Sequence, residues 1–416
     1  MNPSYSELFS TFGRIGIYSF GGPAAQIALM HRELVERKGW IEEEDFLSAL
    51  SFCMLLPGPE AMQLATYTGW RLNGVHGALT AGLLFVFPGA IAMFAISAIY
   101  AIWRTVPLVE GVFFGVQCTV VAIVIEALFK VSKKALKAPD RWLIAALSFL
   151  ALFAFGVPFP AIIALSAIWG FIFAHPAANK RRDETTASRV HWPILVFGAL
   201  WIIPFVVLWA TNSTFLWNVA VFFSKLAVVT FGGAYAVLAY MAQEVVAEHG
   251  WISTAQMMDG LALAETTPGP LILVTQFVGF QAGYAAGGMP LAIIAALITL
   301  WVTFVPCFLW IFAGAPFLPR LTASPRISGA LSAITAAVVG VILNLSVWFA
   351  ANVLFRDIGK LDLGPLSVLT VDLASVDWSA VGLTSLGIVS LLVLRFSLGA
   401  TLLIGAAAGL SLNLSL

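Results

Sequence analysis

Residues 20–22 read Phe-Gly-Gly and residues 57–59 read Pro-Gly-Pro, and both stretches recur 211 positions later, at 231–233 and 268–270. Over positions 20–59, 15 of 40 residues are identical to their partners 211 further on, without a gap. The pair Gly39-Trp40 is repeated in the same register. The chain therefore contains two homologous halves, each interrupted by a Gly-Gly and a Pro-Gly-Pro sequence.

The composition indicates a membrane protein. Of 416 residues, 10% are charged and 60% are hydrophobic, whereas about a quarter of the residues of an ordinary soluble domain are charged. This excludes a soluble enzyme, and the net charge of zero argues against a nucleic-acid partner, which needs clustered Lys and Arg. The lipid bilayer is the expected environment, and the fold class is an all-α polytopic membrane protein.

Hydropathy predicts about thirteen transmembrane segments in the two halves. We expect a first membrane half at 1–175, a cytoplasmic linker at 176–191 and a second membrane half with C-terminal helices at 192–416. The predicted segments are 9–30, 46–70, 77–103, 107–129, 142–157, 158–175, 192–210, 215–241, 257–284, 290–313, 327–350, 379–394 and 396–413. The polar stretch 352–378 is expected to be a solvated external loop.

The basic residues predict the orientation. With a cytoplasmic N-terminus, 13 of the 21 Lys and Arg residues lie inside and six outside, which favours a periplasmic C-terminus. The loop 31–45 fits poorly, because its three basic residues fall outside. The alternative is a cytoplasmic loop followed by a re-entrant hairpin at 46–70, and the same choice between spanning and re-entrant applies to 257–284.

The number of crossings decides how the two halves are related. Seven crossings separate the two repeat starts, an odd number, so the halves are expected to be inverted, as in many secondary transporters. If one segment is re-entrant instead, the repeats become parallel.

The repeated breaks are the predicted substrate site. Proline fixes φ and lacks a backbone donor, so each Pro-Gly-Pro separates two half-helices. Such a break is tolerated at membrane depth only where protein or a water-filled cavity satisfies the freed backbone groups, and the N-terminus of the following helix attracts anions. The alternative is a packing kink. The predicted substrate-binding residues here are Gly21, Gly22, Pro57, Gly58, Pro59, Gly232, Gly233, Pro268, Gly269 and Pro270.

One basic residue lies at the same position in each half. Arg14 aligns with Lys225 at the offset of 211. A basic residue at membrane depth is costly and usually faces the protein interior, although its side chain can also extend to the interface. Two equivalent cations would suit a doubly charged oxyanion, so both are included in the predicted substrate site.

Acidic and neutral polar residues surround the breaks. Glu60 follows the first Pro-Gly-Pro and Glu265 precedes the second, and we consider both as proton-coupling groups, because a carboxylate beside a dianion favours protonation. For Glu60, stabilisation by a helix N-terminus is the simpler explanation. Supporting polar residues are Gln63, Thr66, Thr267 and Gln276, each of which also suits plain helix packing.

Metal and cofactor motifs are absent from the sequence. The three cysteines lie far apart in apolar runs, and the five histidines have no metal-ligand spacing. We therefore expect no metal, no cofactor and no catalytic residue.

The paired motifs resemble those of the chromate ion transporter family in its long, two-domain form, over nearly the whole chain. The resemblance implies a bacterial inner-membrane protein that exports chromate and confers chromate resistance, with antiparallel halves. Sulfate is an expected competitor, and a sulfate or other oxyanion transporter or channel is the alternative. The second half departs from the first in having Ala234 where the first has Pro23. The oligomeric state, a homo-oligomer included, stays open.

Overall fold

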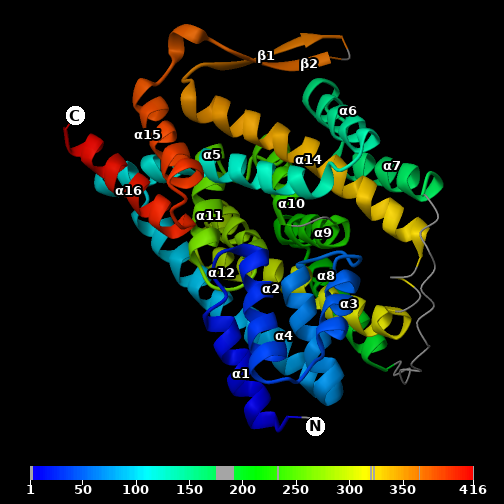
Figure 1. The fold of residues 1–416 in the computed structure, drawn as a ribbon. Coiled ribbons are helices and arrows are strands. Elements are labelled where there is room, and N and C mark those ends of the chain that lie inside the picture. Colours follow the sequence, from blue (N-terminus) through cyan, green and yellow to red (C-terminus); the bar gives the residue numbers. More distant parts are fainter. Residues whose placement is uncertain are drawn as a thin grey trace. The chain divides into compact units, whose positions relative to one another are not determined.

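Long apolar runs can satisfy their backbone hydrogen bonds within a membrane only as helices or closed barrels. The computed structural model describes residues 3–174, 192–231, 234–318, 321, 324–364 and 366–415. In this part of the chain every regular element is a helix, apart from one β-hairpin (Figure 1). The helical membrane-protein class is confirmed, and the hairpin, within the expected loop 352–378, is the departure from it.

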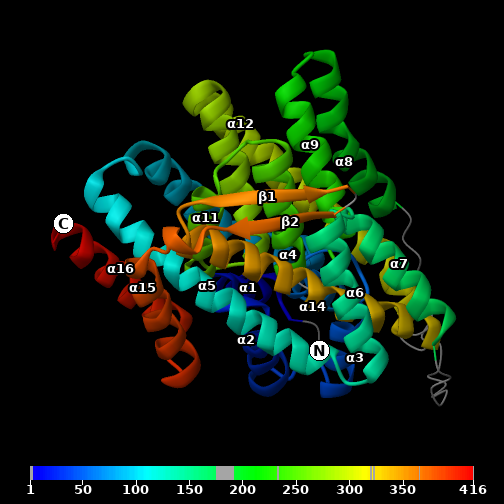
Figure 2. The ribbon, with the colours of Figure 1, turned by 90° about the horizontal axis from the view of Figure 1, so that it is seen from above.

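Contacts divide the chain into two units, and each unit takes elements from both halves. The first unit covers residues 1–98, 175–234 and 267–328. Its elements are α1 (Tyr5–Ile17), α2 (Gly22–His31), the π-helical segment Arg32–Arg37, α3 (Glu43–Cys53), most of α4 (Glu60–Trp103), α8 (Trp192–Ala210), α9 (Thr214–Val229), the 3₁₀ turns Leu271–Leu273 and Ala315–Phe317, and α12 (Val274–Gly314). Figure 2 shows α8 and α9 side by side, and both pack on α12.

The second unit covers residues 99–174, 235–266 and 329–416. Its elements are the end of α4, α5 (Pro107–Ala135), α6 (Pro139–Phe155), α7 (Phe159–Ile172), α10 (Ala234–Ala242), the π-helical segment Gln243–Glu248, α11 (Thr254–Thr266), most of α14 (Pro325–Leu354), β1 (Ile358–Leu363), β2 (Leu366–Val371), the 3₁₀ turn Leu373–Ser375, α15 (Trp378–Ile388), the π-helical segment Val389–Val393 and α16 (Leu398–Ser415). The strands pair antiparallel, with Ile358 opposite Val371.

The local structure repeats at the same offset as the sequence. The two π-helical segments begin at Arg32 and Gln243, which are 211 positions apart. Gly39 and Gly250, also 211 apart, both have a positive φ, of 58° and 60°. The repeated residues therefore form the same local conformations in both halves.

The two longest helices are each folded into two limbs. Helix α4 has non-helical backbone angles at Asn73 and Gly74, and α12 has them at Gly287 and Gly288. In α4 the limbs 60–72 and 75–103 pack so closely that a Cβ atom on Gly69 would strike the backbone of Gly77. The short limb has 13 residues, or about 20 Å at 1.5 Å per residue, which is less than the roughly 30 Å hydrocarbon core.

The predicted crossing at 46–70 instead folds back on itself. Asp45, near the start of α3, forms an ion pair with Arg71, at the end of the short limb of α4, with an oxygen to nitrogen distance of 2.7 Å. Further along, the rings of Phe52 and Tyr67 lie 5.8 Å apart. The two helices are therefore antiparallel and their outer ends lie together, the arrangement that the re-entrant alternative predicts.

The predicted crossing at 9–30 also returns to the side from which it starts. His31, the last residue of α2, places its Nε2 2.6 Å from Glu43 Oε2, at the start of α3. At the start of α1, the Pro3 carbonyl accepts a hydrogen bond from Asn73 Nδ2 at 3.1 Å. The outer ends of α1, α2, α3 and the short limb of α4 thus gather at one end of the first unit.

The second unit is held together by close contacts between small residues. On α5, Gly111 and Gly115 touch Gly405 and Gly409 of α16, and no glycine in this set has room for a Cβ atom. Two Gly-x-x-x-Gly pairs facing each other are typical of membrane helix packing. Elsewhere in this unit, Gly340 of α14 meets the backbone of α6.

Six described helices are long and apolar enough to cross a membrane. They are Glu60–Trp103, Pro107–Ala135, Trp192–Ala210, Leu271–Phe317, Pro325–Leu354 and Leu398–Ser415, with shorter apolar helices at Phe159–Ile172, Thr214–Val229 and Trp378–Val393. A multi-pass membrane protein is therefore supported, and the number of thirteen crossings stays a prediction.

The folded-back hairpins predict which residues share a side of the membrane. Cysteines introduced at Lys38 and at exposed His76 should react with a membrane-impermeant maleimide from the same side, because the segments 9–30 and 46–70 that precede them each fold back. Thirteen simple crossings would place them on opposite sides. Labelling of right-side-out and inverted vesicles measures this, with Lys360→Cys in β1 as the reference for the opposite side and the buried native cysteines giving little background.

Candidate functional site

Each break in the first half is built on glycine in a backbone conformation that other residues avoid. Helix α1 ends at Ile17 and α2 begins at Gly22, with φ values of 85° at Gly21 and 77° at Gly22. Between α3 and α4, Gly58 has a φ of 124°. Gly269, its repeat partner, has a φ of 88°. Left-handed angles cost little for glycine alone, so the sequence specifies both chain reversals.

Two equivalent hydrogen bonds cross between the halves. The Gly58 N–H donates to the Thr230 carbonyl at 2.9 Å, and the Gly269 N–H donates to the Ser19 carbonyl at 2.9 Å. Ser19 and Thr230 are 211 positions apart, as are Gly58 and Gly269. Each Pro-Gly-Pro is therefore tied to the residue that precedes Phe-Gly-Gly in the other half, and both bonds lie within the first unit.

Two glutamine side chains complete the backbone pairing at these breaks. Gln26 Nε2 donates to the Gly269 carbonyl at 2.6 Å and to the Ser19 carbonyl at 3.3 Å. Gln63 Nε2 donates to the Pro57 carbonyl at 2.7 Å. A carbonyl freed by a helix break must be paired if it is buried, and these amides supply the pairing.

Neighbouring helices leave little room for a side chain at Gly58 and Gly269, the central residues of the two Pro-Gly-Pro sequences. A Cβ atom on Gly58 would lie 2.8 Å from Gln63 Nε2 and 3.0 Å from Cys307 Sγ. Gly89 in turn packs directly against the Pro268 carbonyl. Gly89 and Cys307 each directly follow a proline, Pro88 and Pro306 respectively. The residues that pack against the two breaks thus differ in chemistry.

Several buried polar atoms near the breaks have no hydrogen-bond partner among the described residues. They are Ser19 Oγ, Gln26 Oε1, Gln63 Oε1 and Gln276 Oε1. Buried polar groups are normally paired with protein or water. Unpaired atoms at two broken helices therefore mark a place for water or a polar ligand.

The predicted cations lie on the helices that lead into the breaks. Arg14 is in the last turn of α1, and Lys225 is at the equivalent position in α9. Both residues are exposed on the protein surface. Arg14 has no ion pair among the described side chains. The structure thus keeps one basic side chain accessible, one to two turns before each break.

The other predicted residues fall into different groups. Thr66 Oγ1 donates to the Met62 carbonyl of its own helix at 2.9 Å. Gln276 Nε2 donates to the Ala90 carbonyl of α4 at 3.2 Å and so joins α12 to α4. Thr267 is buried beside the second break. Gly232 and Gly233 lie outside the described residues.

The two predicted carboxylates lie in different units. Glu60 is the first residue of α4, in the first unit, where the helix N-terminus stabilises a negative charge. Glu265 is buried in α11, in the second unit.

Sequence reasoning missed Ser19 and Gln26. The signal for Ser19 was present, because a hydroxyl residue precedes Phe-Gly-Gly in both halves, as Ser19 and Thr230. Gln26 had no such signal, since its repeat partner is Val237. Only the fold brings its side chain to the Pro-Gly-Pro of the other half.

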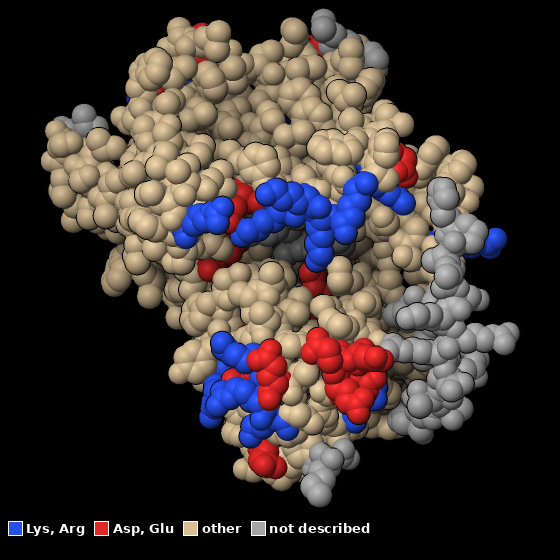
Figure 3. Space-filling model, in the orientation of Figure 1, with Lys and Arg blue, Asp and Glu red and all other residues tan. Residues whose placement is uncertain are grey.

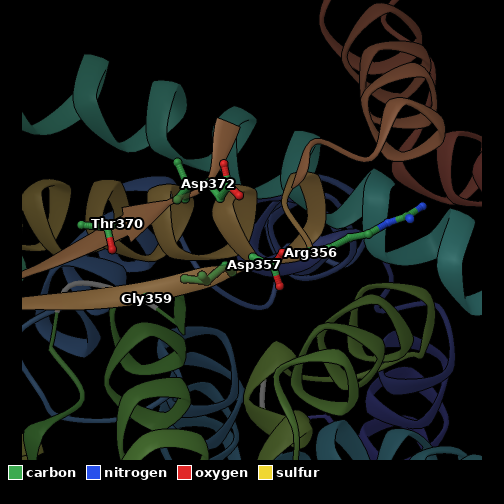
Figure 4. A pocket seen from close by; sticks show the side chains of 7 residues that line it. Arg356, Asp357, Gly359, Thr370 and Asp372 are labelled. Atoms are coloured by element: carbon green, nitrogen blue, oxygen red, sulfur yellow. The ribbon is translucent and has the colours of Figure 1, made fainter. Parts of the chain in front are cut away.

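Other charged surfaces do not form a comparable site. Figure 3 shows Lys and Arg in a band across one face, and α5 closes with Lys133 and Lys134 in its last turn. At the base of the β-hairpin a shallow groove includes Asp357 and Asp372, from which Arg356 extends away (Figure 4). Its guanidinium pairs with Asp377 at 3.1 Å. In the described residues no group of three His, Cys, Asp or Glu side chains could hold a metal ion.

Comparison with known proteins identifies relatives of the whole chain. The family model described as "Chromate transporter" matches residues 6–171 and 217–411. A "Chromate transport protein" of Pseudomonas aeruginosa is 32% identical over 348 residues, covering 82% of this chain and 79% of the relative. Another of that name, from Cupriavidus metallidurans, is 31% identical over 348 residues and covers 82% of each chain. No solved structure matches.

A shorter relative matches only part of the chain. An uncharacterised transporter of Bacillus subtilis is 31% identical over 137 residues, covering 33% of this chain and 69% of its own length. The family model likewise matches two separate stretches of this chain. Both results agree with the repeat seen in the sequence.

Gly58 and Gly269, the central residues of the two Pro-Gly-Pro sequences, should tolerate no side chain. Gly58→Ala and Gly269→Ala should each lower the free energy of unfolding by about 2 kcal/mol or more, because a left-handed φ is strained for alanine and the added Cβ atom crowds its neighbours. Thermal unfolding of the purified protein measures this. Gly13→Ala in α1, which meets nothing within 4 Å, is the matched control, and equal stability of all three variants would contradict the proposed role of the breaks.

Proposed function

Because the chain belongs to the chromate transporter family, we propose that it exports chromate from the cytoplasm across the bacterial inner membrane and so confers resistance to chromate. Its relatives are named as transporters rather than enzymes. The observation that carries the proposal is the pair of crossed hydrogen bonds, Gly58 to Thr230 and Gly269 to Ser19. They bring two broken helices from different halves together, the arrangement in which secondary transporters bind substrate.

The oxyanion binds beside the two breaks. Gly21, Gly22, Gly232 and Gly233 allow close approach of backbone, and the two Pro-Gly-Pro sequences supply helix N-termini. Ser19 Oγ, whose hydrogen is not used by a described partner, can donate to an oxyanion. Arg14 and Lys225 balance the two negative charges, one from each half. Glu60 and Glu265 take up protons when the anion is bound.

The chain is oriented with its N-terminus in the cytoplasm and its C-terminus in the periplasm. Residues 1–175 and 192–416 form the two halves, joined by the cytoplasmic linker 176–191. If the segments 9–30 and 46–70 and their repeat partners 215–241 and 257–284 are re-entrant, nine crossings remain. The halves stay inverted, and the basic residues on the cytoplasmic side rise from 13 to 16, with three outside. With nine crossings the three basic residues of 31–45 lie on the cytoplasmic side, so this scheme follows the positive-inside rule more closely than thirteen crossings do.

Contacts within the second unit support the same arrangement. A cavity of about 190 Å³ is lined by Gly156, Glu248 and Lys360 among other residues. In the scheme of nine crossings all three belong to the periplasmic side. Thirteen crossings would place Glu248 in the cytoplasm, opposite the other two, so the cavity favours the re-entrant scheme.

The membrane potential favours export. Moving one charge through 100 mV is worth about 2.3 kcal/mol, so a dianion that leaves the cell across a potential of roughly 150 mV, negative inside, gains about 7 kcal/mol. Outward transport therefore needs no ATP. Chromate and sulfate are both tetrahedral dianions, so donors alone discriminate poorly between them, and sulfate is the second candidate substrate.

Removal of either cation should impair transport. We expect Arg14→Ala and Lys225→Ala each to reduce chromate flux about tenfold or more, since a charge-assisted contact contributes about 1.5–3 kcal/mol. Arg14→Lys and Lys225→Arg, which keep the charge, should retain more activity. Flux into inverted vesicles measures this at matched protein levels, and full activity of both alanine variants would contradict the site.

The driving force can be tested in the same vesicles. Chromate uptake into inverted vesicles should fall when the membrane potential is dissipated, because the dianion then loses its electrical gain. Dissipation of the pH gradient alone tests proton coupling, and added sulfate tests selectivity. Linear flux without saturation or counterflow would instead indicate a channel.

A further inference from the structure

A carboxylate that the proposed substrate site does not use is buried in the second unit. Asp259, in α11, is completely buried. Tyr100 Oη donates to its Oδ2 at 2.6 Å, and Gln117 Nε2 donates to its Oδ1 at 2.8 Å. Arg104 Nε lies 4.0 Å from Oδ2. These side chains come from the end of α4, the turn after it, α5 and α11, and all belong to the second unit.

The donors around Asp259 determine what it can bind. A hydroxyl and an amide both direct hydrogens at the carboxyl oxygens, so the group is arranged for an anion or for a proton on that anion, and not for a metal cation. The surroundings stabilise the ionised form of Asp259 only in part, because the nearest cation is not in direct contact with it. At 4.0 Å the Arg104 guanidinium is too far for a hydrogen bond, it is 35% exposed, and it also lies over the Tyr100 ring, 5.7 Å from the centroid.

Arg104 is the charge that acts on Asp259. Among the helices that pack on α11, α5 contributes neutral Gln117, and α16 contains no ionisable residue. From the end of α4 and the following turn come Tyr100 and Arg104. A buried carboxylate with one loose cation can exist in either protonation state, and exposed Arg104 connects it to water.

The position of Asp259 links it to transport. It lies nine residues before Pro268 on the helix that leads into the second Pro-Gly-Pro. Its repeat partner in the first half is Ser48, a partly buried residue whose hydroxyl donates to the Glu44 carbonyl of its own helix. The carboxylate is therefore present in one half only.

We propose that Asp259 is a proton-binding site of the transporter, reached from the periplasmic side past Arg104, and that its protonation is coupled to movement of the second broken helix. The coupling and the periplasmic access rest on the proposed function; the proton site itself does not. A proton from water bonds to Oδ2. The Tyr100 hydroxyl then changes from donor to acceptor, and Arg104 loses its counter-charge.

Infrared spectroscopy tests the proton site without transport. Purified protein in lipid vesicles should show a protonated-carboxyl C=O band that disappears as the pH is raised between about pH 4 and 9, and that is missing in Asp259→Asn. Asp140→Asn, at an exposed carboxylate at the start of α6, should leave the band unchanged. A band that titrates identically in wild type and Asp259→Asn overturns the proposal.

Transport measurements test the coupling. Tyr100→Phe removes a donor to the ionised form, so the midpoint of the pH profile of chromate flux should move to higher pH by about one unit or more, whereas Asp259→Asn should flatten the profile. Tyr100→Phe keeps the carboxylate and so remains informative if Asp259→Asn does not fold. An unchanged midpoint in Tyr100→Phe overturns the coupling.

The two proposals fail in different ways. If the wild type transports no chromate but the Asp259 band titrates, the proposed function fails and the proton site is supported. If chromate flux is normal but no band titrates, the proton site is overturned and the proposed function stands.

Discussion

The constraint on which the first unit depends is that a helix broken inside a membrane must pair its freed backbone groups with protein. Neither half of this chain does so alone. The Gly58 N–H is satisfied by the Thr230 carbonyl and the Gly269 N–H by the Ser19 carbonyl, so each break is completed by the other half. Gln26 and Gln63 pair the adjacent carbonyls. The glycines and the amide side chains of the two breaks therefore both contribute to the stability of the first unit.

The same constraint explains why the breaks come in pairs and why the surrounding helices are short. A limb of 13 residues is too short to cross the hydrocarbon core. If α3 and the short limb of α4 form a re-entrant hairpin, as proposed above, their helix termini and the unpaired polar atoms lie at membrane depth. The basic residues of 31–45 and Arg71 then gather at one end of this hairpin, as the Asp45–Arg71 ion pair shows.

The helical class, the repeat and the breaks could be predicted from the sequence, because each depends on local composition or on self-similarity, whereas the role of Arg14 and Lys225 stays a prediction. Hydropathy could not show whether the chain folds back at 46–70, since an apolar run has the same hydropathy whether it spans or returns. The ion pair of Asp45 with Arg71, which shows that it folds back, joins residues 26 apart. The β-hairpin in 352–378 was expected as a loop, because its alternation of polar and apolar residues is short. The contacts of Gln26, and those of Asp259 with Tyr100 and Gln117, could not be predicted from the sequence either, because they join residues that lie 142 to 243 positions apart.

The crossed hydrogen bonds also impose an order on biosynthesis. Gly58 and its acceptor Thr230 are separated by 172 residues of chain, which a ribosome adds in roughly 10 to 30 s at 5–20 residues per second. Throughout that interval the first break is inserted without its acceptor, and it can be protected only by lipid headgroups, water or the insertion machinery. The second break meets a Ser19 carbonyl that is already in place. The first half of this protein therefore cannot complete its folding until the second half has been synthesised.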